Sequence, residues 1–268
     1  MKVGSIRLHP VKATAVVPVA NAVVELAGLR HDRRWAVVTP DGRRLNATTH
    51  DVLLSVVATP DDNGGLTLSS TSQPSTHVPV PTGGALLTVD VSRLPTMVDA
   101  GEGAAAWFSR LLDEPVRLAW QDDPSRRTIA DSHGGLGDEP LNLADTGPLL
   151  LTTSASLEQL DRWIAEDHGD QPMDMSRFRP NVVVDGDIAP FSEDDWRSLI
   201  IGGVPFRFAE LCDRCVVTTI DPVTLSHGKE PIRTLARHRR WDGKTWFGVR
   251  IVPLTTGTIS VGDEVLAC

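Results

Sequence analysis

The sequence contains no tyrosine, only three cysteines and no long apolar run. The absence of tyrosine excludes any mechanism that needs a phenolic acid or a tyrosyl radical. Three cysteines, one of which is the last residue, do not make the disulfide framework of a small secreted domain. No run of about 18 apolar residues is present, and the first residues do not form an apolar signal region. These absences predict a cytoplasmic protein that does not enter a membrane.

The chain also lacks an excess of positive charge. Its 26 Lys and Arg against 35 Asp and Glu give a net charge of −9. This balance argues against nucleic acid or an anionic membrane as the main partner. Clusters of basic residues therefore stand out, and they lie at residues 30–34, 43–44, 177–179 and 237–240.

Short β-rich segments separated by turns of Gly, Pro and Asp dominate the pattern. They predict a mainly β (α+β) fold of two β-barrel-like domains with a few peripheral helices. The predicted strands include residues 3–8, 35–38, 52–58, 149–153, 182–184 and 216–220. The predicted helices span residues 104–112, 154–169 and 231–238, and Ser154 is the expected cap of the second. A stretch rich in Gly, Asp and Pro, residues 121–140, predicts a link between domains 1–122 and 123–268.

Two of the three cysteines, Cys212 and Cys215, form a C-x-x-C motif just before the β-branched run 216–220. The motif is open to three interpretations. A thioredoxin-like redox pair prefers a helix N-terminus, whereas a strand is predicted here. Structural zinc needs further Cys or His ligands at short spacing. The third interpretation is a single thiolate bound to a soft metal, with the other cysteine as a buried small residue. Spacing alone does not decide among them.

Several segments in one order extend over almost the whole chain. They are His9-Pro10-Val11-Lys12, Asp32-Arg33-Arg34-Trp35, Asp145-Thr146-Gly147-Pro148, Arg177-Phe178-Arg179-Pro180-Asn181, Glu193-Asp194-Asp195-Trp196, Cys212-Asp213-Arg214-Cys215 with Thr218-Thr219-Ile220-Asp221-Pro222, and Gly257-Thr258-Ile259 with Val261-Gly262-Asp263. In this order they resemble the MOSC proteins, named for the C-terminal domain of molybdenum cofactor sulfurase. The likeness is to the branch of the mitochondrial amidoxime-reducing component and its bacterial relatives.

The resemblance implies an N-terminal MOSC-associated β-barrel domain and a C-terminal MOSC β-barrel domain. It further implies a molybdenum cofactor, Mo-molybdopterin, bound between them, with Cys215 as the protein ligand of the metal. A soft thiolate suits a metal that dithiolene sulfurs already hold. Cys212 has no assigned role under this interpretation and is expected to be structural.

The resemblance also assigns the cofactor-binding residues. Lys12 and Arg33 match positions that contact the phosphate side of the cofactor, and Thr146, Arg179 and Asn181 match positions on the pterin side. Lys and Arg form charge-assisted bonds to phosphate, and an Asn amide pairs with a pterin edge in both directions. The sequence departs from the family pattern at Ala13, where a serine is usual.

The implied activity is the reduction of small N-hydroxylated or N-oxygenated compounds by a molybdenum-dependent oxidoreductase. The chain has no cysteine-rich ferredoxin-like extension, so a separate electron-donor protein, a ferredoxin or a flavoprotein reductase, is expected. We likewise expect a protein without the membrane-targeting segment of the mitochondrial branch. Two alternatives are a molybdopterin carrier without turnover, and a redox or zinc domain built on the cysteine pair.

Overall fold

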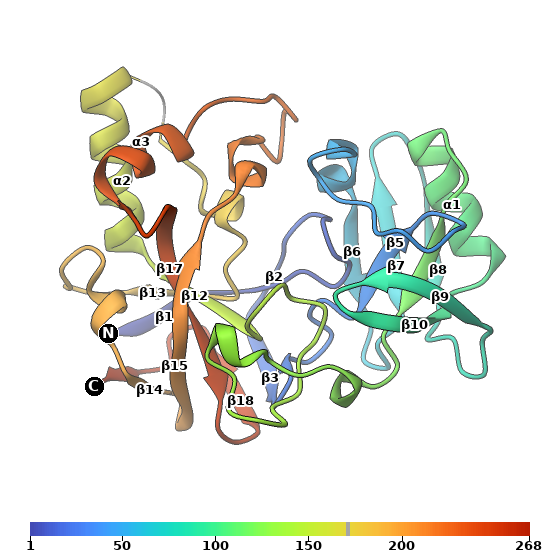
Figure 1. Ribbon diagram of the computed structural model, residues 1–268, viewed down its shortest axis with the longest axis horizontal. Coiled ribbons are helices and arrows are strands. Elements are labelled where there is room, and N and C mark those ends of the chain that lie inside the picture. The colour runs from blue at the N-terminus through green and yellow to red at the C-terminus, as the bar shows by residue number, and fades with distance from the viewer. Residues whose placement is uncertain (170–171) are drawn as a thin grey trace.

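The protein is mainly β-structure with three α-helices in residues 1–169 and 172–268, the part of the chain that the computed structural model describes. Two lobes lie side by side (Figure 1). One lobe contains the largest sheet together with α2 (Ser154–His168) and α3 (Ile232–His238), and the other contains α1 (Glu102–Leu112). The predicted mainly β class is therefore confirmed.

The largest sheet has nine strands in the order β19-β14-β15-β17-β12-β13-β1-β2, with β16 paired to β17. Its strands are β1 (Lys2–Leu8), β2 (Val17–Val19), β12 (Leu149–Thr153), β13 (Val182–Asp185), β14 (Ser198–Ile201), β15 (Val204–Asp213), β16 (Arg240–Trp241), β17 (Lys244–Pro253) and β19 (Val265–Ala267). Only β12 and β13 pair in parallel, and α2 connects them. Every residue of β12 is buried, as its apolar sequence requires.

The other lobe contains two smaller sheets that pack around fully buried Trp35, Trp107 and Phe108. The four-stranded sheet has the order β5 (Trp35–Val38), β11 (Arg117–Trp120), β10 (Leu94–Asp99) and β9 (Leu86–Val91). The three-stranded sheet has the order β6 (Val57–Pro60), β7 (Leu66–Ser70) and β8 (Gln73–Val78). Aromatic burial of this size provides this lobe with a core of its own.

The first strands of the chain do not stay with the lobe that follows them in sequence. β1 pairs with β13, and β3 (Asn21–Glu25) lies between β4 (Gly28–Leu29) and β18 (Gly257–Ser260). Residues 2–29 thus join strands of the C-terminal half of the chain, and one of these strands, β18, lies close to its end. The predicted boundary between a first domain, residues 1–122, and a second domain, residues 123–268, stays a prediction.

One predicted strand is wrong, and another is wrong in its first part. Residues 216–219 form a 3₁₀ turn, because Thr218 and Thr219 donate their hydroxyls back to the carbonyls of Cys215 and Val216, at 2.9 and 2.8 Å. A threonine hydroxyl that bonds to the main chain of its own turn stabilises that turn in place of a strand, although threonine has a high β-propensity. Residues 51–55 form another such turn before β6 begins. The 3₁₀ segments are η1 (Asp51–Ser55), η2 (Pro124–Arg126), η3 (Asp131–His133), η4 (Met175–Phe178), η5 (Ser192–Asp195) and η6 (Val216–Thr219).

The three predicted helices are present, with one change at a cap. The N-cap of α2 is Thr153, whose hydroxyl accepts from the Ser156 amide, and the expected Ser154 is the first helical residue. The C-cap is Gly169 with a φ of 67°, a left-handed conformation that glycine adopts without strain. No helix in residues 1–169 and 172–268 has the length and apolar character needed to cross a membrane.

Candidate functional site

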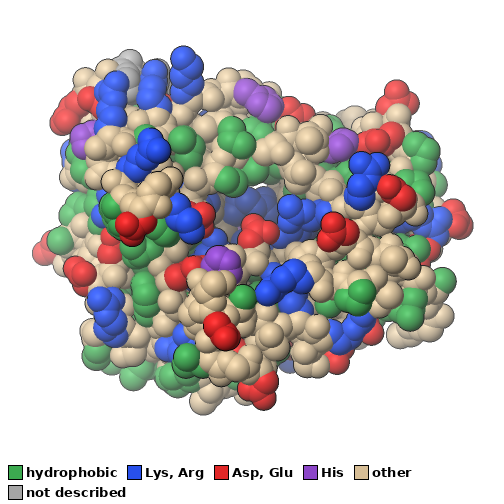
Figure 2. Space-filling model, viewed as in Figure 1, with side chains coloured by type: hydrophobic (Ala, Val, Ile, Leu, Met, Phe, Trp, Pro, Cys, Tyr) green, Lys and Arg blue, Asp and Glu red, His purple; other side chains and the backbone are tan. Residues whose placement is uncertain are grey.

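A cavity of about 380 Å³ lies between the two lobes. Its lining comes from segments far apart in the chain, namely residues 12–13, 33, 44–48, 54, 144–145, 147, 150, 177–179, 181, 212–218 and 250. Figure 2 shows a hollow near the middle of this face, with Lys and Arg side chains gathered in it. The volume is that of a site for a small molecule or cofactor.

The cavity is strongly cationic although the whole chain is acidic. Seven basic side chains line it against two carboxylates, Asp145 and Asp213. The basic residues are Lys12, Arg33, Arg44, Arg177, Arg179, Arg214 and Arg250. Converging cations of this kind favour a polyanionic ligand such as a phosphate ester.

Lys12 lies at one side of the cavity and is held from two directions. Its backbone amide donates to the Trp35 carbonyl at 2.7 Å, and Nζ donates to the Leu143 carbonyl at 2.7 Å and to Asp145 Oδ1 at 2.6 Å. Burial lowers the pKa of Lys12 to about 8, and Asp145 opposes this shift. Lys12 in turn holds the pKa of the Asp145 carboxyl well below its usual range. The pair is charged at neutral pH.

Arg33 and Arg179 have left-handed backbone conformations, with φ of 48° and 57°. Arg33 donates Nη2 to the Arg179 carbonyl and Nη1 to Asn181 Oδ1, each at 3.0 Å. Arg179 donates Nη1 to the Thr14 carbonyl at 2.5 Å. Burial lowers the pKa of Arg179 to about 9, so this guanidinium also stays charged at pH 7. Each arginine is fixed in place by the main chain of distant segments.

Asn181 is fully buried beneath these arginines. Its Oδ1 accepts from the Leu150 amide at 3.1 Å as well as from Arg33, and its Nδ2 donates to the Arg7 carbonyl at 3.2 Å. The side-chain oxygen therefore already has two partners within the protein. Asn181 joins β1, β12 and Arg33 at one point.

A buried carboxylate supports the same corner of the cavity. Asp32 is fully buried, forms an ion pair with Arg33 Nη1, and accepts from the His9 backbone amide at 2.7 Å. Burial, with Arg179 and Arg33 close by, lowers the pKa of His9 well below its ordinary value, so this histidine is neutral. Asp32 thus balances part of the charge that the arginines concentrate here.

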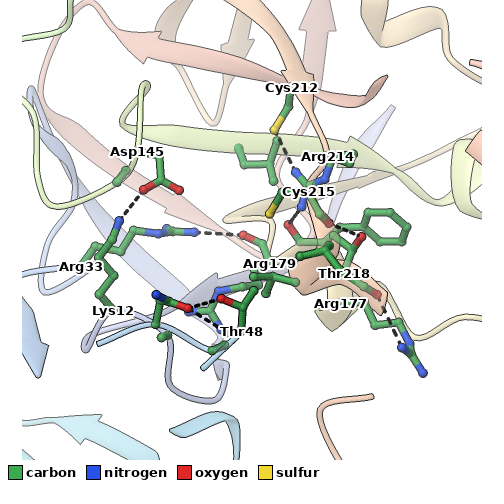
Figure 3. Close-up of a pocket in the computed structure, with 18 of the residues that line it drawn as sticks. Lys12, Arg33, Thr48, Asp145, Arg177, Arg179, Cys212, Arg214, Cys215 and Thr218 are labelled. Atoms are coloured by element: carbon green, nitrogen blue, oxygen red, sulfur yellow. Dashed lines mark hydrogen bonds and ion pairs between the residues drawn. The ribbon is translucent and has the colours of Figure 1, made fainter. Parts of the chain in front are cut away.

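The two cysteines of the C-x-x-C motif have opposite surroundings. Cys212 is buried in β15, and Arg214 Nη1 donates to its sulfur at 2.8 Å. Cys215 is exposed and begins the turn of residues 216–219, just past the end of β15. Both line the cavity, and Figure 3 shows basic side chains from both lobes around Cys215. Only Cys215 offers an accessible thiol to a ligand there.

Two arginines hold the turn that presents Cys215. Arg177 Nη2 donates to Asp221 Oδ2 at 2.6 Å, and Arg214 Nη2 donates to the Phe178 carbonyl at 2.7 Å. The Nε atoms of both arginines are buried without a hydrogen-bond partner. These contacts tie η4 to the residues on either side of η6, and they leave Cys215 exposed at the rim of the cavity.

Five of the six predicted site residues line this cavity, namely Lys12, Arg33, Arg179, Asn181 and Cys215. Thr146 lies between two lining residues, but its hydroxyl donates to Glu210 Oε1 at 2.6 Å. Its predicted contact with a cofactor stays a prediction. Sequence reasoning did not assign Arg44, Arg177, Arg214, Arg250 or Asp145. The basic clusters 43–44 and 177–179 were a usable signal for two of them.

The described residues contain no cluster of three or more His, Cys, Asp and Glu side chains that could hold a metal ion.

Two family models together cover most of the chain. The model described as the MOSC N-terminal beta barrel domain matches residues 1–115, and the model of the MOSC domain matches residues 138–266. The resemblance seen in the sequence is thereby confirmed over both parts of the chain.

The chain is similar over almost its full length to proteins of animals. It is 32% identical to mitochondrial amidoxime-reducing component 1 of Homo sapiens, over 98% of this chain and 82% of that protein. Identity and coverage are the same for mitochondrial amidoxime reducing component 2 of Homo sapiens. It is 30% identical to molybdenum cofactor sulfurase of Danio rerio, over 97% of this chain but 33% of that longer protein.

Among solved structures, the YuaD protein from Bacillus subtilis aligns over 98% of this chain and 93% of its own. The TM-score is 0.44, with 10% sequence identity.

Proposed function

The chain belongs to the MOSC family, with the MOSC N-terminal β-barrel domain before the MOSC domain, and from this premise we propose that it is a molybdenum-cofactor-dependent reductase of N-hydroxylated compounds. The observation that supports the proposal most is the cavity itself: one exposed thiol, Cys215, at the rim of a site lined by seven basic side chains. A phosphate-bearing dithiolene cofactor needs both features.

The residues present fit such a cofactor. Lys12 and Arg33 would hold the phosphate side, and Cys215 would be the protein ligand of molybdenum between the two lobes. The Nε atoms of Arg177 and Arg214, buried without partners, mark a region that holds more donors than the protein itself satisfies. Arg179 and Thr146 would lie on the pterin side, as the resemblance implies. For Asn181 the contacts support a different role: its oxygen orients Arg33 and anchors the Leu150 amide.

When bound, the cofactor supplies the two-electron redox chemistry that removes oxygen from an N–O bond. In the overall reaction an N-hydroxyl compound, two electrons and two protons give the N–H compound and water. The chain contributes binding and orientation: its cations fix the anionic cofactor, and the rim at Cys215 leaves open space for a small substrate. Electrons would come from a separate ferredoxin or flavoprotein reductase. The relatives are named as mitochondrial, whereas a cytoplasmic location stays a prediction for this chain.

Elemental analysis tests the proposal. Protein from a host that makes molybdenum cofactor is expected to contain close to one molybdenum per chain, and Cys215→Ser is expected to lose most of it, because a serine hydroxyl is a poor substitute for thiolate. Cys268→Ser changes another exposed cysteine and should keep the metal. Retained molybdenum in Cys215→Ser would refute the ligand assignment, and zinc in place of molybdenum would support the alternative of a zinc domain.

A turnover assay separates the enzyme from a carrier. The molybdenum-loaded protein, given a chemical reductant, is expected to convert an amidoxime to the amidine. Full molybdenum content without turnover would show a cofactor carrier.

A further inference from the structure

A second, smaller cavity opens beside the thiol end of the site. It has a volume of about 170 Å³ and shares four lining residues with the larger cavity: Leu54, Arg177, Arg179 and Val217. Val217 is two residues beyond Cys215, so this side pocket adjoins the rim where the thiol is exposed. Lys12, Arg33 and Arg44 do not line it.

The lining of the side pocket is mainly apolar, in contrast to the larger cavity. Its apolar side chains are Ala15, Val16, Leu54, Val217, Ile220, Pro222 and Val223. The two arginines in its wall each have a partner within the protein: Arg177 Nη2 donates to Asp221, although its Nε has no partner, and Arg179 donates to the Thr14 carbonyl. Such a surface favours an uncharged, apolar group.

The pocket has a preformed outer wall. The Asp221 Oδ1 accepts from the amides of Val223 and Thr224, at 2.9 and 2.8 Å, while its Oδ2 accepts from Arg177. These hydrogen bonds fix the conformation of the loop of residues 221–226, although Val223 is 87% exposed. A preformed wall reduces the entropy lost when a ligand binds.

We propose that the side pocket is the subsite for the aryl or alkyl substituent of the substrate. The inference rests on the proposed function, since it places the N–O group at the Cys215 rim and the apolar substituent against Val217 and Val223. A cavity of about 150 Å³ is sufficient for a benzene ring. The pocket therefore favours N-hydroxylated substrates whose substituent is a ring or a short branched chain.

A matched pair of substrates tests the subsite, because acetamidoxime and benzamidoxime differ only in a methyl or a phenyl group. Wild-type protein is expected to show a higher kcat/KM for benzamidoxime. Val223→Asp places a carboxylate on the wall of the pocket. It should lower the ratio of kcat/KM for benzamidoxime to kcat/KM for acetamidoxime about tenfold. Leu136→Asp makes the same kind of change at another exposed apolar residue, 72% exposed and outside both cavities, and should leave the ratio unchanged.

Ala15→Leu provides a second variant, because it fills the pocket without adding charge and should lower the ratio in the same direction. Calorimetric titration of the two amidoximes gives a readout that does not need turnover. One outcome supports the subsite and refutes the proposed function. In it, neither amidoxime is reduced, benzamidoxime binds more tightly than acetamidoxime, and Val223→Asp weakens the binding of benzamidoxime. If both are reduced and neither Val223→Asp nor Ala15→Leu changes the ratio or the binding, the subsite is refuted and the proposed function stands.

Discussion

The two sides of the larger cavity, which lies between the lobes, differ in burial and in hydrogen bonding. On the inner side, Arg33 bonds to Asp32 and to Asn181, all three side chains bond to the main chain, and the side chains of Asp32 and Asn181 are fully buried. On the outer side, residues 215–223 leave a thiol and two valines, Val216 and Val223, exposed to solvent. The inner side sets the shape and charge of the site, and the outer side leaves groups free for ligand and substrate. This difference predicts that substitutions on the inner side lower the stability of the fold. Substitutions on the outer side are expected to change ligand binding and activity only.

The largest effect on folding is expected on the inner side. Asn181→Ala removes one hydrogen-bond partner each from the Leu150 amide, the Arg7 carbonyl and Arg33 Nη1, which keeps its ion pair with Asp32, and should lower the free energy of unfolding by about 3 kcal/mol. Urea denaturation of the cofactor-free protein measures this loss. Arg44→Ala alters the same cavity at a more exposed side chain and should cost less than about 1 kcal/mol. Equal losses for the two variants would remove the distinction between the sides.

Lys12 also lines the cavity, and its pKa predicts a pH dependence. Burial lowers that pKa to about 8, so the ligand-free protein loses the Lys12 proton as the pH rises from 7 to 9. Sulfate serves as a probe for the phosphate side of the cavity, and it keeps its charge over this range. The affinity of the cavity for sulfate should therefore fall by up to about tenfold from pH 7 to pH 9. Calorimetric titration at both pH values measures the fall. Lys12→Met should bind sulfate more weakly at pH 7 and show a flatter profile; an unchanged pH dependence in this variant would contradict the assignment.

The smallest effect concerns the buried member of the cysteine pair. Cys212→Ala leaves Arg214 Nη1 without its sulfur acceptor and should lower the free energy of unfolding by about 1 kcal/mol. Molybdenum content should stay as in the wild type, in contrast to Cys215→Ser. Denaturation and elemental analysis of the same preparation give both values. Loss of molybdenum from Cys212→Ala would show that the two thiols act together.

Local patterns in the sequence predicted most of the elements. The apolar run 149–153 and the helix after it were predicted because hydrophobic periodicity and capping act within a few residues. Residues 216–220 were predicted wrongly because their β-branched side chains suit a strand, while two threonine hydroxyls close a turn instead. The pairing of β1 with β13 and of β3 with β18 depends on contacts between residues far apart in the chain, which no local pattern records.

The site shows the same division between local and distant information. Resemblance in the sequence identified Lys12, Arg33, Arg179, Asn181 and Cys215, and the structure brings all five to one cavity. It did not show that Arg214 and Arg250 belong there, or that Asn181 uses its oxygen inside the protein.

By itself, the sequence determined the mainly β class and the family, and it identified the basic and cysteine residues that we propose for the cofactor, because these follow from composition, spacing and motif order. Only the tertiary structure decided which cations converge, which cysteine is exposed, and that an apolar pocket opens beside Cys215. The physical reason is that burial and charge at a site are sums over side chains far apart in the chain, and folding alone brings those side chains together.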